Sequence, residues 1–277
     1  MSDALTYSEL PSRALIAVGG PDWRGFLQGL ITQDVETLAA GEARFGALLT
    51  PQGRLLFDLF VVGRADGCWL DVLADSREAL IQRLTMYRLR AKVEIAADET
   101  MVSCAYGAAR PVGAGWTADP RLSDLGWRGY GVSAPAGAVV ADEAARERRK
   151  LALGVPGPAD WGSDKTYPIE ANFDLLNGID FKKGCFVGQE TTSRMKRRGQ
   201  VKSRMLPIAF AGQAPAPGSE ILAGSLRAGE VLSGGEGRAM ALVRLDRVAG
   251  AELSVDGRPV RVERPAWFAA QVGQDAA

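Results

Sequence analysis

The sequence predicts an α+β protein in which helices pack on antiparallel sheets, followed by a small C-terminal β-barrel. Between residues 45 and 73, short apolar runs alternate with turns that contain Pro or Gly, which is the pattern of β-hairpins. From about residue 205, strand-type segments recur at short intervals and include a hairpin whose turn is Asp256-Gly257. A helical pattern at residues 75–89 lies between predicted strands, which favours helices and antiparallel strands in one domain.

The totals of the chain exclude several classes of protein. A chain of 277 residues can bury the core of one large domain or of two to three small ones. Its 33 basic and 33 acidic residues cancel, which argues against a protein that coats nucleic acid over its whole surface, although a local basic patch stays open. The chain has no histidine, which excludes a Ser-His-Asp triad, a Cys-His dyad and a histidine zinc site.

The three cysteines, Cys68, Cys104 and Cys185, are far apart and form no CxxC pair. An ordinary iron–sulfur cluster needs about four cysteine ligands, so this chain cannot build one alone, and we predict no metal site. Cys68 and Cys104 stand in strand-like segments and are predicted to be packing residues. Residues 1–15 resemble neither a signal peptide nor a transit peptide, and no apolar run could span a membrane. We therefore expect a cytoplasmic location of the bacterial type and no membrane partner.

The first elements lead to two groups of polar residues. A strand is predicted at residues 14–18, and a helix that starts at Pro21-Asp22 carries an apolar stripe as far as Leu30. Gln33 and Asp34 follow it, either as caps and solvated side chains or as site residues.

Asp58 stands among leucines and phenylalanines in a predicted strand. A carboxylate in that position needs a partner, because burying an unpaired charge is costly.

From residue 75 onward, local caps, turns and strand patterns predict the remaining elements. Residues 75–78, Asp-Ser-Arg-Glu, are a plausible capping box for a helix to about Leu89. Strands are expected at 92–95 and 101–106, loops and short strands at 107–141, a helix at 142–153, a loop-rich segment at 154–180, and β-structure throughout from about 205.

Residues 181–198 combine more chemically reactive groups than any other stretch. Gly184 and Gly188 bracket Cys185, and glycine allows a tight turn or a close approach to a ligand because it tolerates positive φ. Residues 189–196 read as a helix with Glu190 in its first turn.

Lys182 and Lys183 precede Cys185, and cationic neighbours together with a following helix N-terminus favour a thiolate. The alternative is that Cys185 is a small buried hydrophobic residue.

Residues Lys183–Glu190 resemble the K-G-C-Y/F-x-G-Q-E signature of the YgfZ family, folate-binding relatives of the glycine cleavage T-protein whose eukaryotic members act in mitochondrial iron–sulfur protein maturation. Phe26–Val35, Leu49–Arg54 and Pro168–Ala171 resemble further motifs of the family, so the similarity covers most of residues 20–205. It implies a GcvT/YgfZ-like region at residues 1–204 with two lobes, a C-terminal β-barrel domain at 205–277, and a central cleft that holds folate.

The resemblance also implies roles for individual residues. Glu170 would bind the pterin ring, since a carboxylate can accept its amino group and ring N–H together. Cys185 would lie exposed beside the cofactor as a transient cluster ligand or a redox thiol, with Lys183 favouring the thiolate. An aspartate at the Asp58 position is linked in the T-protein to catalysis, but two adjacent aspartates stand there, whereas this chain has Phe57-Asp58. The residues expected to bind the cofactor are Glu170, Gly184, Gly188, Gln189, Glu190, Arg194, Gln33 and Asp34.

The function that the resemblance implies is that of a tetrahydrofolate-binding accessory protein, which binds tetrahydrofolate or a one-carbon derivative of it. It would support iron–sulfur cluster assembly or repair in client enzymes, including those that modify tRNA, and would be non-enzymatic or weakly catalytic. Its partners would be folate and iron–sulfur client or assembly proteins.

Two alternatives are a folate-dependent aminomethyltransferase that uses Asp58 and a tRNA-binding module with weak contacts. The basic residues that the second would use also fit a solvated helix end or a site for the glutamyl tail of folate. We favour the solvated helix end for most of them, with Arg194 as the best candidate for a site role because it lies closest to the motif. They are Arg194, Lys196, Arg197, Arg198, Lys202 and Arg204.

Overall fold

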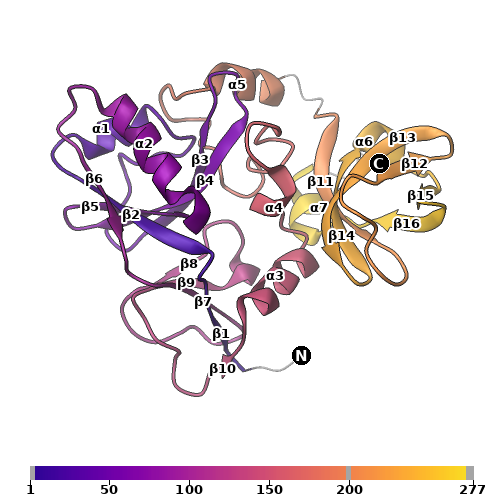
Figure 1. Cartoon of the computed structure of the whole chain (residues 1–277), viewed down its shortest axis with the longest axis horizontal. Helices are drawn as coiled ribbons and strands as arrows, with labels where there is room; N and C mark the ends of the chain where they lie inside the picture. Colours follow the sequence, from indigo (N-terminus) through magenta and orange to yellow (C-terminus); the bar gives the residue numbers. More distant parts are fainter. Residues whose placement is uncertain (1–3, 198–200, 273–277) are drawn as a thin grey trace. The chain divides into compact units, whose positions relative to one another are not determined.

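The computed structural model describes residues 4–197 and 201–272 of the chain, which separates into two compact units (Figure 1). The first unit consists of Met1–Gln52, Leu56–Arg146 and Leu176–Gln189. The second consists of Gly53–Leu55, Glu147–Leu175 and Glu190–Ala277. The domain limits expected above, residues 1–204 and 205–277, stay a prediction.

The first unit is built on a five-stranded sheet with strand order β3-β4-β5-β2-β6. Two helices, α1 and α2, cover one face of it (Figure 1), because Ile16 and Val18 of β2 and the apolar stripes of both helices are buried in one core cluster. The elements are β2 (Arg13–Gly19), α1 (Trp23–Gln28), β3 (Ala43–Leu49), β4 (Leu55–Arg64), β5 (Gly67–Leu73), α2 (Arg77–Arg88) and β6 (Glu94–Asp98).

A second five-stranded sheet packs on the opposite face of the first. Successive side chains of a strand point to opposite faces, so Leu15 faces away from the helices and joins Val102, Cys104 and Tyr130 in a separate core cluster. The strand order is β10-β1-β7-β9-β8, with β10 parallel to β1. The strands are β1 (Thr6–Glu9), β7 (Val102–Tyr106), β8 (Trp116–Ala118), β9 (Trp127–Tyr130) and β10 (Val139–Val140).

The second unit contains a closed barrel of strand order β11-β14-β13-β12-β15-β16. The predicted Asp256-Gly257 turn joins its last two strands, and both residues are left-handed, with φ of 50° and 75°, as a tight hairpin turn requires. The strands are β11 (Ser203–Ala209), β12 (Glu220–Ala223), β13 (Leu226–Gly235), β14 (Arg238–Arg244), β15 (Leu253–Val255) and β16 (Arg258–Val262).

The remaining helices are short. The expectation of β-structure throughout the tail is wrong at α6 and α7, and Phe268 of α7 is buried in the core of the barrel. The helices are α3 (Glu143–Ala152), α4 (Pro158–Trp161), α5 (Gln189–Arg197), α6 (Leu245–Val248) and α7 (Ala266–Val272), with 3-10 turns η1 at Ala74–Ser76 and η2 at Ser123–Leu125.

The predicted α+β class and the closed C-terminal barrel are confirmed, but the predicted capping box before α2 is wrong. Ser76 has φ of −100° and ψ of −7° and makes no side-chain cap hydrogen bond. An N-cap residue normally has extended backbone angles, and here the preceding 3-10 turn carries the chain into the helix instead. Within the described ranges no helix is long and apolar enough to cross a bilayer.

Candidate functional site

The side chain of Lys183 connects the loop before α5 to the end of α1 and the segment that follows it by hydrogen bonds. Its ammonium Nζ donates hydrogen bonds to the backbone carbonyls of Gln28 at 2.8 Å, Ile31 at 2.6 Å and Gln33 at 2.9 Å. An ammonium has three N–H donors, so these bonds use all of them. One side chain thus joins two of the motifs that were recognised separately in the sequence.

The surroundings of Lys183 affect both the pKa of its ammonium and the hydrogen bonds that it can make. Burial lowers its pKa to about 8, against the opposing effect of the carboxylates of Asp34, Asp180 and Glu36. With all three donors bound to carbonyls, Lys183 has none left for the sulfur of Cys185. The lysine therefore makes no direct hydrogen bond to the thiol, and the expectation that its charge favours the thiolate stays a prediction.

The loop around Cys185 is fixed on both sides of the thiol. On one side, Asp180 Oδ1 accepts hydrogen bonds from the backbone N–H groups of Lys182 at 2.7 Å and Lys183 at 3.2 Å. On the other side, Phe186 is buried, and Val187 packs against the core under α1 and α2. Cys185 between them is exposed, as the family resemblance implied.

The other two cysteines are buried, as predicted. Burial raises the pKa of Cys68 to about 12 and also raises that of Cys104, so both stay protonated at neutral pH. A thiolate is the reactive and metal-binding form, and buried thiols of this kind are inert. Of the three cysteines, Cys185 is therefore the one that can react or bind a metal as a thiolate.

The two glycines that flank Cys185 differ. Gly188 has φ of 80°, a left-handed conformation that favours glycine, immediately before α5. Gly184 has no such conformation, and a Cβ atom added to it would meet nothing within 4 Å. Gly184 therefore leaves open space next to the exposed thiol.

The side chains of Gln33 and Asp34 form hydrogen bonds to several other segments of the first unit. Gln33 Nε2 donates to the carbonyls of Asn177 at 2.7 Å and Phe45 at 3.1 Å. Asp34 accepts from Gln28 Nε2 at 2.9 Å and from Arg44 Nη1 at 2.7 Å.

Burial would raise the pKa of Asp34, but hydrogen bonds from Thr37, Gln28 and Arg44 outweigh it and hold the pKa well below its usual range. These side chains are largely committed to internal partners. A contact of Gln33 or Asp34 with the cofactor stays a prediction.

Asp58 has the partner that a buried carboxylate requires. Arg13 Nη1 lies 3.2 Å from Asp58 Oδ2, and the same guanidinium bonds Asp71 through Nε at 2.7 Å. Arg128 also pairs with Asp71 and lies 3.8 Å above the ring of Phe60. Asp58 is thus one end of a buried ionic network that lies between the two sheets of the first unit.

The sequence analysis missed the rest of this network. Burial would raise the pKa of Asp71, but the charges of Arg128 and Arg13 hold it below its usual value. A charged residue inside an otherwise apolar strand was the available signal, because it must find a partner. Asp71 and Arg128 stand in such strands, just as Asp58 does.

Glu170 lies half-buried in the second unit with one carboxylate oxygen occupied. Oε2 accepts a hydrogen bond from the backbone N–H of Tyr167 at 3.1 Å, and no donor from the described parts of the chain reaches Oε1. Burial raises the pKa of Glu170, opposed by the Tyr167 N–H and by the charges of Arg54 and Arg204. A desolvated carboxylate with spare acceptor capacity is suited to a ligand that offers N–H donors.

Arg204 is not part of a solvated basic run. It is buried, and its guanidinium bonds both oxygens of Asp174, at 2.5 and 3.0 Å, and the carbonyl of Ile169 at 2.7 Å. Lys196 of α5 also reaches Asp174, at 3.5 Å. Asp174 thus pairs with two of the six cations, and the predicted basic surface is correspondingly smaller; Arg198 lies outside the described residues.

α5 presents the remaining predicted residues. Gln189 and Glu190 form its first turn, where an acidic residue complements the helix dipole, and both Glu190 and Arg194 are exposed. Arg194 forms no ion pair with any residue that the structure describes.

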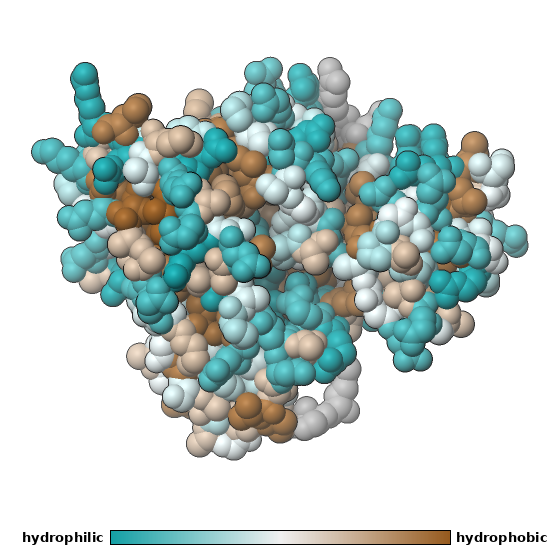
Figure 2. All heavy atoms as spheres, in the orientation of Figure 1, coloured by the Kyte–Doolittle hydropathy of each residue, from teal (hydrophilic) through white to brown (hydrophobic). Residues whose placement is uncertain are grey.

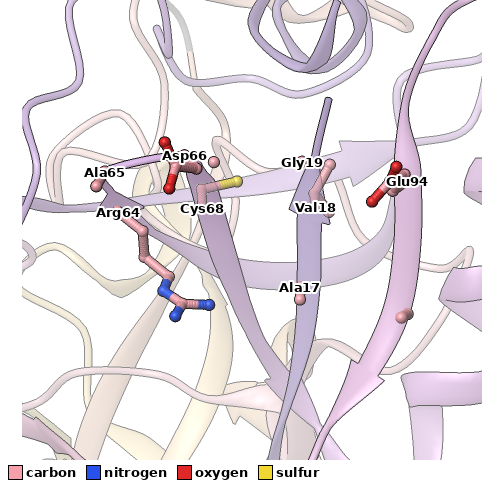
Figure 3. Close-up of a pocket in the computed structure, with 10 residues that line it drawn as sticks. Ala17, Val18, Gly19, Arg64, Ala65, Asp66, Cys68 and Glu94 are labelled. Carbon is pink, nitrogen blue, oxygen red and sulfur yellow. The ribbon is translucent and has the colours of Figure 1, made fainter. Parts of the chain in front are cut away.

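No predicted site residue lines the cavity of about 260 Å³ in the first unit that Figure 3 shows. It lies over the β5-β2-β6 part of the sheet, with Asp66 and Glu94 on opposite sides of β2 and Arg64 below (Figure 3). Across residues 4–197 and 201–272 there is no group of three or more His, Cys, Asp or Glu side chains that could hold a metal ion.

Comparisons with known proteins place these residues in context. Residues 202–270 match the family model of the CAF17 C-terminal beta-barrel domain. The mitochondrial iron-sulfur cluster assembly factor IBA57 homolog of Neurospora crassa is 32% identical over 240 residues, which cover 75% of this chain and 55% of that protein. Human mitochondrial IBA57 is 28% identical over 277 residues, covering 87% and 78%. The chain spans little more than half the length of the first three fungal relatives, at 55%, 54% and 57%.

The fold has a close counterpart among solved structures. The glycine cleavage system aminomethyltransferase T from Bartonella henselae superimposes with a TM-score of 0.78 at 18% identity, covering 95% of this chain and 86% of that one. The GcvT-like fold predicted from the sequence is confirmed.

The expected cytoplasmic location is wrong. The Neurospora, Phaeosphaeria and human relatives are all named as mitochondrial proteins. Cysteine content and the lack of a long apolar run report on redox conditions and membrane spans, and neither property separates one reducing compartment from another.

Proposed function

We propose that the chain, which is similar to mitochondrial iron–sulfur cluster assembly factors, supports iron–sulfur cluster assembly by presenting Cys185 to a client or assembly protein. The observation that carries the proposal is the exposure of this thiol on a loop held by Lys183 and Phe186, while Cys68 and Cys104 are buried. A fixed and accessible sulfur is what a shared ligand requires.

The cluster is the cargo in this proposal and is shared between two molecules. Cys185 loses its proton and supplies one thiolate to an iron atom, and the partner supplies the other ligands, since clusters are usually held by about four. α5 begins at Gln189, and the positive N-terminal end of its helix dipole favours a negative charge nearby. A redox role for the same thiol is the competing hypothesis.

Tetrahydrofolate is the cofactor that we propose for the second unit. When bound, it supplies a reduced pterin that can carry a one-carbon group. Glu170 would accept the pterin N–H donors, because Oε1 has no bond from the described residues and Oε2 keeps a second lone pair beside its bond from Tyr167. These donors would replace the water that the half-buried carboxylate has lost.

The thiol proposal is tested in cells that depend on this protein for cluster-containing enzymes. Cys185→Ser should abolish the activity of those enzymes, because a hydroxyl is a poor ligand for iron. Cys104→Ala is the matched control and should retain activity as long as the protein accumulates normally. Full activity with Cys185→Ser would contradict the proposal.

A second measurement separates cluster ligation from redox chemistry. The reduced protein is mixed anaerobically with a cluster-loaded scaffold protein, and visible absorption and Mössbauer spectra are recorded. Ligation predicts a spectral change with wild type and none with Cys185→Ser. Loss of cellular function without any spectral difference between the two proteins would assign Cys185 to redox chemistry.

The folate proposal is tested by anaerobic calorimetric titration with tetrahydrofolate. Glu170→Ala should weaken binding about ten- to a hundredfold, since hydrogen bonds to a charged group contribute roughly 1.5–3 kcal/mol. Glu252→Ala, an exposed glutamate of the same unit, is the control and should bind as wild type does. Equal affinities for all three proteins would remove Glu170 from the site.

Two contacts weigh against aminomethyl transfer. Asp58 is paired with Arg13, and Phe57, which stands where the T-protein has a second aspartate, packs against the core. A turnover assay with an aminomethyl donor and Asp58→Asn would detect the activity if it exists.

A further inference from the structure

The C-terminal end of α2 carries an apolar tip, which we define as residues 86–92. α2 ends at Arg88, and Leu89 follows with φ of 44° and ψ of −105°, a combination that residues other than glycine rarely adopt. Met86 is 62% exposed and Leu89 is 89% exposed, the latter among the most exposed large apolar side chains of the described residues. Figure 2 shows brown apolar spheres beside teal hydrophilic ones at this end of α2, at the upper left.

The tip is held firmly despite this exposure. The backbone N–H of Lys92 donates to Asp22 Oδ2 at 2.7 Å, and the N–H of Ala91 donates to the carbonyl of Arg88 at 2.8 Å. Tyr87 and Ala91 pack against the core on the inner side. The outward position of Leu89 therefore belongs to the fold, and its unusual backbone conformation calls for an explanation.

Cations without acidic partners surround the apolar pair. Arg88, Arg90 and Lys92 are exposed, and none of the three forms an ion pair with any part of the chain that the structure describes. The guanidinium of Arg88 donates a hydrogen bond to the carbonyl of Val93, at 3.4 Å. The sequence from residue 79 to residue 93 contains no acid, in a chain whose net charge is zero.

We propose that the apolar tip docks on an anionic membrane surface, a role beyond the proposed function. Leu89 and Met86 would enter the headgroup layer while the three cations meet lipid phosphates, which is how interfacial segments bind. A lipid surface supplies an apolar layer and negative charge together, so it complements both features. Nucleic acid complements the cations but offers little to two aliphatic side chains.

The test is co-sedimentation of the full chain with vesicles of phosphatidylcholine alone or of phosphatidylcholine mixed equally with phosphatidylglycerol, at low and physiological salt. Wild type should sediment with the mixed vesicles only, and less at higher salt. Replacing Arg88, Arg90 and Lys92 with Gln should lower the partition coefficient about fivefold for each cation, or about a hundredfold together. Met86→Ser combined with Leu89→Ser should also release the protein.

Control substitutions come from the second unit. Leu226→Ser removes a 61% exposed leucine and Lys165→Gln removes an exposed cation, and both should sediment as wild type does. Equal sedimentation of the tip variants and wild type, or no sedimentation of wild type with mixed vesicles at low salt, would overturn the proposal. Binding to polyglutamate in place of vesicles would also overturn it and would assign the tip to an acidic protein.

Discussion

Replacing Lys183 with methionine would test whether one buried ammonium holds the cysteine loop in place. Methionine keeps most of the length of the stem and removes the charge and all three N–H donors. The carbonyls of Gln28, Ile31 and Gln33 would lose bonds of 2.8, 2.6 and 2.9 Å. Two segments about 150 residues apart would then be joined by apolar packing and by weaker contacts.

The size of the effect follows from the contacts. A hydrogen bond from a charged donor contributes about 1.5–3 kcal/mol, so three of them set an upper limit of roughly 5–9 kcal/mol. Two terms reduce this figure. Lys183 is only partly buried, so water already competes for part of its hydrogen bonding, and burial of the ammonium lowers its pKa to about 8. We expect a net loss of about 2–4 kcal/mol in the free energy of local unfolding of the two segments that Lys183 joins.

Hydrogen exchange read out by mass spectrometry measures this loss locally. Lys183→Met should accelerate exchange of the amides at residues 28–34 and 180–187 and leave the barrel strands unchanged. Lys182→Met is the matched control, because Lys182 is exposed and only its backbone N–H is bonded. Its exchange should equal that of wild type.

The reasoning would be refuted if the two variants exchanged at the same rate in both segments. Such a result would mean that packing of Phe186 and Val187, together with the hydrogen bonds of Thr32 to Gly178 and Asp180, holds the loop without help from Lys183. Uniform acceleration over the whole first unit would instead show that the lysine stabilises the global fold.

Three further predictions each concern one residue. Asp174→Asn should cost about 3–5 kcal/mol in chemical denaturation of the second unit, because it leaves the buried guanidinium of Arg204 without its carboxylate; a loss as small as that of an exposed pair would refute it. Asp34→Asn should flatten the acid side of the curve of stability against pH. The pKa of Asp34 in the folded protein lies below the unfolded value, so the wild type has this stability above about pH 4 and loses it as the pH falls toward the folded pKa. Parallel curves for the two proteins would contradict this prediction. With a thiol reagent, the native protein should react at one cysteine, and Cys185→Ser should remove that reaction, with further thiols appearing only on unfolding; rapid labelling of the native variant would contradict this.

Much of the fold could be predicted because its signals are local. Alternation and hairpin turns predicted the strands from residue 45 to residue 73, and Asp256-Gly257 predicted a turn whose left-handed φ values the structure has. The motif at residues 183–190 depends on identity and spacing alone, which a sequence displays directly. Local backbone preference decides such features, so neighbouring residues contain the information.

Only the tertiary structure decided which partner each polar side chain has. Nothing near Lys183 in the sequence indicates that its ammonium binds carbonyls of residues 28–33, and the basic run from residue 194 to residue 204 gives no sign that Arg204 is buried against Asp174. The same holds for the exposure of Leu89, a large apolar side chain that faces solvent. A charge or a thiol takes its properties from the groups that packing brings around it, and packing joins segments that are far apart in the chain.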